Sequence, residues 1–504
     1  MNPTKETIAQ LAKTYGADPV ELEGILIKGG WTTATGLVNY DLEALARIML
    51  ANPTPLREAI PRVPGRKGDT AHRWKAILSL PSDSQTSPYV SEGQRNTANA
   101  PAVQNFLAPY AVIQKETYLT FEGEEAATDF DDAKAKSRLV LMQDVFRQEE
   151  KQWLYGNYNY ALGQAVVATP VGSTVTGGAL SGTMSVICVP LTAEGVNNGA
   201  ISSAGLIQQY TRTNLDQSTD TINGGVGLKS SNQTLVMGGN NTITATCTPI
   251  AGAAGYAWYL GTAGNERIAA ITTLNTVTLG ALPSGTNQLA SALLATDFSF
   301  NDGGTSGTGC TIAAMNGVLT FAAAGASNGS YQQLLTAGAT LTSDGEGGVA
   351  EITAMFQSMY DNYRMGPTDL WVSSDVARKI RNLVIANGAA GSTPYPLARI
   401  MQEAGKPIEV VAGGALPSFH NFYTGDTVLV HVHPYLPKGM VLATARRLPF
   451  IIDEEPNPLQ CRVTRDYWQI EWPLRTTRWE TAIRVREVIE NRFPPSLGLI
   501  GNIA

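Results

Sequence analysis

Cysteine and charge are two things that this 504-residue chain has little of, and both shortages exclude classes of protein. Its four cysteines, Cys188, Cys247, Cys310 and Cys461, are far apart and form no C-x-x-C pair, which excludes a disulfide scaffold and a zinc-site spacing. We predict four buried free thiols. The formal net charge is −7, which argues against a protein that coats nucleic acid over its whole surface, but not against one that encloses it.

Long apolar runs are missing as well. No stretch of 18 consecutive apolar residues occurs, so we expect no membrane-spanning helix and no membrane partner. The first 30 residues are charged and contain no apolar core of a secretory signal. These absences predict a chain made in the cytoplasm.

Signatures of catalysis are also lacking: the chain has no phosphate-binding P-loop, no G-x-G-x-x-G after a strand and no G-x-S-x-G. His431 and His433 lie two positions apart without a third ligand at metal spacing, so we assign both to a solvated or interface face. We interpret Val485-Arg486-Glu487 as ordinary charge on a strand face. We expect no catalytic residue, no cofactor and no metal; an enzyme remains an alternative without a supporting residue.

The middle of the chain differs from the rest in composition. Residues 163–343 are rich in Gly, Thr, Ser and Ala, and about 5% of them are charged, against about 22% elsewhere. Period-2 alternation at Thr242–Cys247, Tyr256–Leu260 and Thr276–Leu279, separated by glycines, predicts strands with frequent turns. We predict an inserted β region at 163–343 that includes an Ig-like module at about 235–285; an unrelated β insertion is the alternative.

Helices and strands alternate in the flanks. Residues 1–51 are predicted to be short helices, and residues 129–155 form one long helix with Leu139, Met142, Phe146 and Trp153 on one face, ended by Gly156. Further predicted elements are the following: a helix at 345–364, a strand at 369–372, a helix at 373–387, a short helix at 397–404, and strands at 409–411, 427–432, 440–443, 469–472 and 482–489.

A basic, proline-rich arm precedes a long polar stretch. Residues 52–68 have the composition of an extended arm, and residues 69–122 are too long and polar for a loop inside a compact domain. We expect both to pack on a neighbouring molecule. The predicted contact residues between subunits are Arg57, Arg62, Arg66, Lys67, Arg73, Trp74 and Lys75. Non-specific contact with nucleic acid is the second interpretation of these cations.

The order of these parts resembles the HK97-type major capsid proteins of tailed bacteriophages. In that family an N-terminal arm, an extended loop, a spine helix, a peripheral domain and an axial domain follow one another. Here the parts would be the N-terminal helical region at 1–51, the arm at 52–68, the extended loop at 69–122, the spine helix and peripheral domain at 123–162, and the axial and peripheral domains at 344–504. The resemblance implies an α+β, HK97-type fold with an all-β insertion.

The function that the resemblance implies is a late structural protein of the virion. It would self-assemble as hexamers and pentamers into an icosahedral shell around double-stranded DNA, which it would touch through non-specific phosphate contacts. Scaffolding, portal and decoration proteins are the other implied partners, and we expect residues 1–51 to stay attached. The alternatives are an encapsulin-like compartment, which encloses protein cargo, and a tail or decoration protein with an Ig-like domain.

Overall fold

The structure is a computed structural model that describes residues 53–79, 89–95, 102–127, 132–174, 178–344, 348–386, 418–448, 457–474 and 476–504. The chain divides into two compact units, Met1–Ala51 with Phe121–Lys134, and Asn52–Thr120 with Ala135–Ala504. Of the first unit the structure describes helix α4 (Phe121–Ala127) and residues 132–134. The predicted helices of 1–51 and 397–404 and the predicted strand at 409–411 lie outside the described residues.

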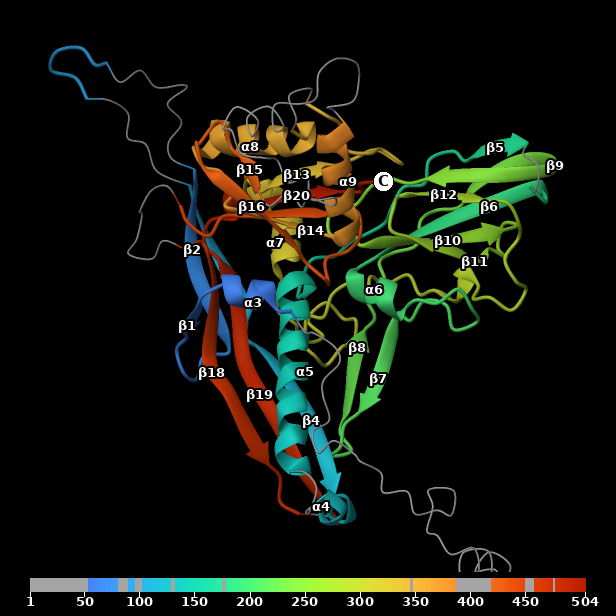
Figure 1. The fold of residues 1–504 in the computed structure, drawn as a ribbon. Coiled ribbons are helices and arrows are strands. Elements are labelled where there is room, and N and C mark those ends of the chain that lie inside the picture. Colours follow the sequence, from blue (N-terminus) through green and yellow to red (C-terminus); the bar gives the residue numbers. More distant parts are fainter. Residues whose placement is uncertain are drawn as a thin grey trace, which may run out of the picture. The chain divides into compact units, whose positions relative to one another are not determined.

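The second unit contains a four-stranded sheet, which we call the peripheral sheet (Figure 1). Its order is β1 (Arg62–Pro64), β18 (Leu459–Glu471), β19 (Arg478–Asn491) and β4 (Ala111–Thr120). β1 runs parallel to β18, and the other neighbours are antiparallel. The sheet therefore joins residues of the predicted arm and extended loop to the C-terminal strands.

The long helix α5 (Ala133–Tyr155) lies along one face of this sheet. The predicted spine helix is confirmed, and Trp153 is buried as expected, but the predicted apolar face is wrong at its start: Leu139 is 56% exposed, whereas Leu141 and Val145 are buried against Ile483 of β19. The prediction was wrong because the buried face also carries two glutamates, which interrupt the apolar stripe.

Gly156 ends the helix, as predicted. Its amide donates to the carbonyl of Gln152 over 2.8 Å, and a Cβ at this position would lie 2.5 Å from the carbonyl oxygen of Met315. Only glycine fits this close approach of two backbone segments.

A two-stranded antiparallel hairpin precedes β4. It consists of β2 (Ala71–Ser79) and β3 (Ala102–Pro109), with Arg73 opposite Leu107 and Trp74 opposite Phe106. The predicted extended loop thus forms a hairpin that continues, through residue 110, into the peripheral sheet.

The axial part is built on a six-stranded mixed sheet. Its order is β13 (Tyr331–Leu334), β20 (Leu497–Gly501), β17 (Val441–Thr444), β14 (Asp369–Val372), β16 (Thr427–Val432) and β15 (Ser418–His420). The predicted strands at 369–372 and 427–432 are confirmed with the expected bounds. All four residues of β14 are buried, because both faces of the sheet are covered.

Helices cover the two faces of the axial sheet (Figure 1). α8 (Ala350–Tyr363) and α9 (Ser374–Ala386) bury Met355, Phe356 and Ile380 against one face. α7 (Val318–Ala324) packs on the other face together with the end of α5. Ser373 Oγ accepts from the amide of Val376 over 3.5 Å, at the predicted start of α9.

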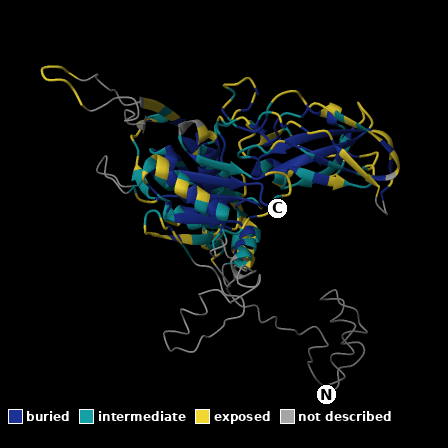
Figure 2. Cartoon of the chain, turned by 90° about the horizontal axis from the view of Figure 1, so that it is seen from above, coloured by how far each residue is buried: buried dark blue, intermediate teal, exposed yellow. Residues whose placement is uncertain are grey.

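The charge-poor middle of the chain forms a second six-stranded sheet. The strands are β5 (Val171–Thr174), β6 (Leu180–Leu191), β9 (Gln233–Thr246), β10 (Gly255–Gly261), β11 (Arg267–Thr272) and β12 (Thr276–Leu279). All pairs in it are antiparallel. β6 lies between β10 and β9, and both of its faces are buried from Met184 to Leu191. The strands of this part of the chain are largely dark blue, that is buried, in Figure 2. Around this sheet lie helix α6 (Ala193–Asn198) and a separate hairpin of β7 (Gln209–Thr213) and β8 (Thr219–Asn223).

The predicted β insertion is therefore present, but an Ig-like module at about 235–285 is not confirmed. The central strand of the sheet, β6, lies outside that window, so these residues do not close a sandwich of their own. The insertion also ends before residue 343, because β13 pairs with β20 and so belongs to the axial sheet. All four cysteines are buried and free, as predicted.

The described elements follow the order that the HK97-type resemblance implies. An arm strand, a hairpin, a spine helix, an inserted β sheet and an axial sheet succeed one another, and the last long strands return to the peripheral sheet. The α+β fold class is confirmed.

Candidate subunit interface

The arm segment 52–68 begins with a helix rather than running extended throughout. α3 (Pro55–Ala59) is five residues long, and its Leu56 is buried. The backbone amides of Leu56 and Arg57 donate to the two carboxylate oxygens of Glu150 on α5, over 2.8 and 2.9 Å. A glutamate of the spine helix therefore supplies the cap that this short helix needs.

Glu150 has a further partner on the axial side. His433 Nε2 lies 2.7 Å from Glu150 Oε1, and both side chains are completely buried. A buried carboxylate is tolerated when its oxygens accept hydrogen bonds in this way. The assignment of His433 to a solvated or interface face is therefore wrong. His433 directly follows the last residue of β16, whereas His431 lies within the strand, is partly exposed and bonds Asp369 over 2.8 Å.

Glu149 binds the cations of the arm. Arg57 Nε lies 3.1 Å from its Oε2, and Arg62 and the hydroxyl of Tyr467 also contact this carboxylate. The guanidinium of Arg57 lies 3.8 Å from the centre of the Phe146 ring, a stacking geometry that holds the side chain against α5. These contacts bind the arm to its own spine helix.

Glu487 of β19 completes the buried network. It accepts from Trp153 Nε1 over 2.8 Å and lies 3.1 Å from Arg62 Nη2. Burial raises the pKa of Glu487 to about 8, with a further increase from nearby Glu149 and an opposing effect of Arg62. The interpretation of Glu487 as ordinary strand-face charge is wrong, because its side chain is fully buried.

The root of the β2–β3 hairpin is fixed on the peripheral sheet. Trp74 Nε1 donates to the carbonyl of Asn491 over 2.9 Å, and its ring stacks on Phe106 and His72 with centroids 5.6 and 5.7 Å away. His72 in turn contacts the buried carboxylate of Glu490. The hairpin therefore leaves the sheet from a rigid base.

The predicted contact residues fall into two groups. Arg57, Arg62 and Trp74 are engaged within the chain by the contacts above. The remaining cations, Arg66, Lys67, Arg73 and Lys75, are exposed. Contact with a neighbouring subunit stays a prediction for these four.

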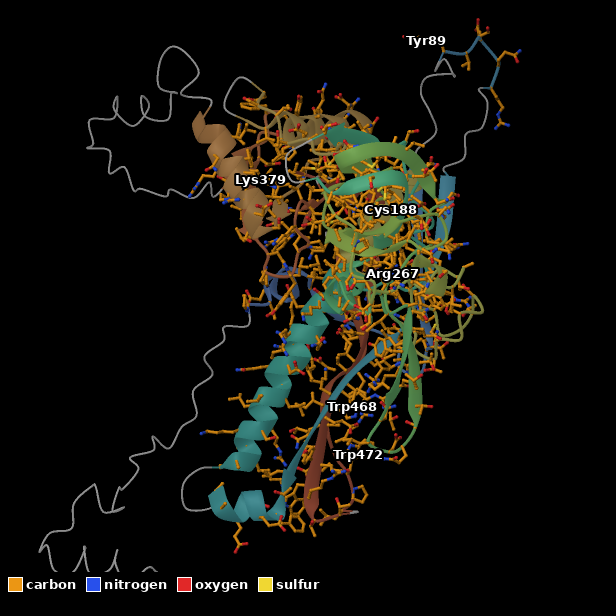
Figure 3. All side chains as sticks on the ribbon, turned by 90° about the vertical axis from the view of Figure 1, so that its right-hand side faces the viewer. Tyr89, Cys188, Arg267, Lys379, Trp468 and Trp472 are labelled. Atoms are coloured by element: carbon orange, nitrogen blue, oxygen red, sulfur yellow. The ribbon has the colours of Figure 1, made fainter. Side chains whose placement is uncertain are left out.

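The outward face of the hairpin also exposes apolar side chains. Leu107 is 49% exposed and Val103 is 53% exposed, and both lie on the face that carries Arg73. Tyr89, labelled in Figure 3, is 88% exposed in the segment that connects the two strands. Large apolar groups left in water on a projecting element are typical of an interaction surface.

Metal and membrane features are absent from what the structure describes. In the described ranges no three His, Cys, Asp or Glu side chains are grouped so that they could hold a metal ion. Nor does any helix within those ranges combine the length and apolar character needed to cross a membrane.

Comparison with known proteins gives structural matches only. No protein-family model and no curated protein sequence matches the chain. Among solved structures, it is similar to the capsid of a native GTA particle, with a TM-score of 0.42, 8% identity and coverage of 93% of this chain and 96% of that one. The chain is also similar to the capsid of Myoviridae phage XM1, with a TM-score of 0.40, 8% identity and coverage of 94% of this chain and 100% of that one. A third similar structure is the holo-SrpI encapsulin complex from Synechococcus elongatus PCC 7942, with a TM-score of 0.35, 7% identity and coverage of 94% of each chain.

Sequence reasoning missed the four buried glutamates described above, Glu149, Glu150, Glu487 and Glu490. A signal was present for the first pair: Glu149 lies four and eight positions after Val145 and Leu141, which places it on the same helix face. The arm carries Glu58 directly after Arg57, so its sequence did not indicate that the arm cations pair with carboxylates far away in the chain.

Proposed function

We propose that this chain is the major capsid protein of a tailed bacteriophage and has a structural rather than an enzymatic role. Copies assemble as hexamers and pentamers into an icosahedral shell, in the virion, around double-stranded DNA. The DNA is held through non-specific phosphate contacts. Scaffolding, portal and decoration proteins are the partners such a shell requires.

The observation that carries this proposal is the contrast within the hairpin. Its root is fixed on the peripheral sheet by Trp74, while its outer face leaves Val103 and Leu107 in water and the segment between its strands leaves Tyr89 in water. A rigid projection with apolar sides is unfavourable in a lone molecule and favourable where another copy covers it. Repeated around a closed ring, such modest contacts add up to a stable assembly.

The test is the assembly state of the purified full chain, with and without a scaffolding partner. Electron microscopy with sedimentation is expected to show closed shells or capsomer rings, and the ratio of absorbance at 260 and 280 nm distinguishes DNA from protein contents. A chain that stays monomeric beside its scaffolding protein would overturn the proposal. Shells filled with protein cargo would favour the encapsulin-like alternative.

A paired variant separates assembly from folding. Val103→Asp with Leu107→Asp is expected to reduce shell yield strongly while leaving the unfolding temperature of the single chain nearly unchanged, because both side chains are already half in water. The matched control is Val236→Asp, on the inserted sheet, where the side chain is 79% exposed. Unaltered shells from the hairpin variant would contradict the role given to this face.

A further inference from the structure

A cavity of about 500 Å³ lies where the arm meets the root of the hairpin. Its walls come from the turn after β1, the start of β2 and strand β18. Four basic side chains line it, Arg66, His72, Arg73 and Arg462, and Asp69 is the acidic residue of the lining. The concave surface is therefore dominated by cations.

Two of these basic side chains are already paired with a carboxylate of the same chain. Arg462 Nε lies 2.9 Å from Glu490, and His72 contacts the same group. Arg66 and Arg73 are exposed at the opening. With Asp69 as the one nearby acid of the lining, the opening keeps an excess of positive charge that favours an anionic ligand.

The surface beside the opening is apolar as well as basic. Arg73 and Leu107 are opposite each other on neighbouring strands, so their side chains share a face. Lys75 follows two positions later on that face, and Leu107 is 49% exposed. A ligand that covers this surface must therefore carry both anionic and apolar groups.

We propose that this cavity and the adjoining hairpin face receive the acidic helix α4 (Phe121–Ala127) of a second copy of this chain. The helix has Glu122 and Glu125 exposed and no basic residue in its last turn. Phe121, at its start, is 36% exposed. One surface then meets a different surface of the next copy, the arrangement that closes rings. The inference rests on the proposed function and names the contact that would hold neighbours together.

Nucleic acid fits this surface less well than a second copy does. Phosphates would pair with Arg66 and Arg73, but they would leave Leu107 uncovered. A chain with net charge −7 supplies carboxylates in every copy, so self-association meets the charge requirement without another molecule.

The experiment is a charge swap in the full chain. The arm variant carries Arg66→Glu with Arg73→Glu, the helix variant carries Glu122→Lys with Glu125→Lys, and a third chain carries all four changes. The control chain joins the helix variant to Lys438→Glu with Arg447→Glu, two exposed cations of the axial part. The assembled fraction is measured by sedimentation, and the unfolding temperature of each chain checks that it folds.

Each two-residue variant is expected to lose assembly by about tenfold or more, because like charges then face each other. The four-residue chain is expected to recover it, and the control chain is not. Mixing the arm and helix variants in equal amounts is also expected to restore association, since each supplies the charge that the other needs. The mixture keeps the test decisive if the four-residue chain does not fold.

The outcomes separate this contact from the proposed function. Wild-type shells together with failure of both the swap and the mixture would overturn the contact and leave the shell intact. An arm variant that assembles normally but loses its DNA would also overturn the contact and favour phosphate binding at the cavity. A wild-type chain that never assembles would remove both proposals.

Discussion

His433 and Glu150, which are 283 positions apart in the chain, share a 2.7 Å hydrogen bond between two completely buried side chains. The same carboxylate caps α3 through the amides of Leu56 and Arg57. One residue of the spine helix therefore ties the arm and the axial part to a single point. Movement of α5 against either part must break at least one of these bonds.

Replacing Glu150 is expected to loosen the arm. Glu150→Ala leaves two backbone amides and His433 without their acceptor and should lower the free energy of unfolding by about 3 kcal/mol. Glu150→Gln keeps one acceptor oxygen and should lose less. Denaturant unfolding followed by tryptophan fluorescence measures the change, and proteolysis within 57–68 should become faster. Glu92→Ala, at an exposed position, is the control; equal stability of Glu150→Ala and this control would refute the capping role.

Stability is expected to fall as the pH rises from about 5 to 9. The pKa of Glu487 is raised from its ordinary 4.5 to about 8, so the folded chain holds its proton more tightly than the unfolded chain. That contribution is complete below pH 4.5 and disappears as the pH passes 8. Glu487→Gln keeps a neutral side chain beside Arg62 and should flatten this slope. Unfolding midpoints at pH 6 and pH 9 for both chains provide the measurement; parallel slopes would show that another group is responsible.

Local pattern was enough to predict several regular elements of this fold. β14 and β12 were predicted with their final bounds, because short runs of β-branched and aromatic residues stand between turn residues. α8 followed from apolar residues at spacings of three and four that all face the axial sheet. In α8 one face of the element meets one core, so periodicity and burial agree.

The candidate interface was predictable only in part. The basic character of the arm was visible, and Arg66 and Arg73 are exposed as expected of contact residues. The partners of Arg57 and Arg62 were not predictable, because Glu149 and Glu487 reach them from elements far away in the sequence. The central place of β6 in the inserted sheet was not predicted for a similar reason: β6 pairs with strands more than 40 positions later, and no local sequence pattern indicates such pairing.

The hairpin root offers a comparison between adjacent residues. Trp74→Ala removes a buried indole stacked between two rings and should cost about 3–5 kcal/mol. Trp74→Phe keeps a ring but loses the bond to the Asn491 carbonyl and should cost about 1 kcal/mol plus the lost packing. Arg73→Ala, one position earlier and exposed, should stay within about 0.5 kcal/mol. Urea unfolding measures the loss of unfolding free energy in each of the three variants. A large loss in Arg73→Ala would contradict the assignment of Arg73 to the exposed face of the hairpin.

The end of the spine helix should tolerate no side chain. A Cβ on Gly156 would lie 2.5 Å from the Met315 carbonyl oxygen and 2.6 Å from that of Gln152, and neither backbone atom can move as a flexible side chain would. Gly156→Ala should therefore destabilise the chain by about 1–3 kcal/mol despite the better helix propensity of alanine. Gly239→Ala is the matched control, since a Cβ there meets nothing within 4 Å. Thermal unfolding compares the two, and equal melting temperatures would mean that α5 can end without this close approach.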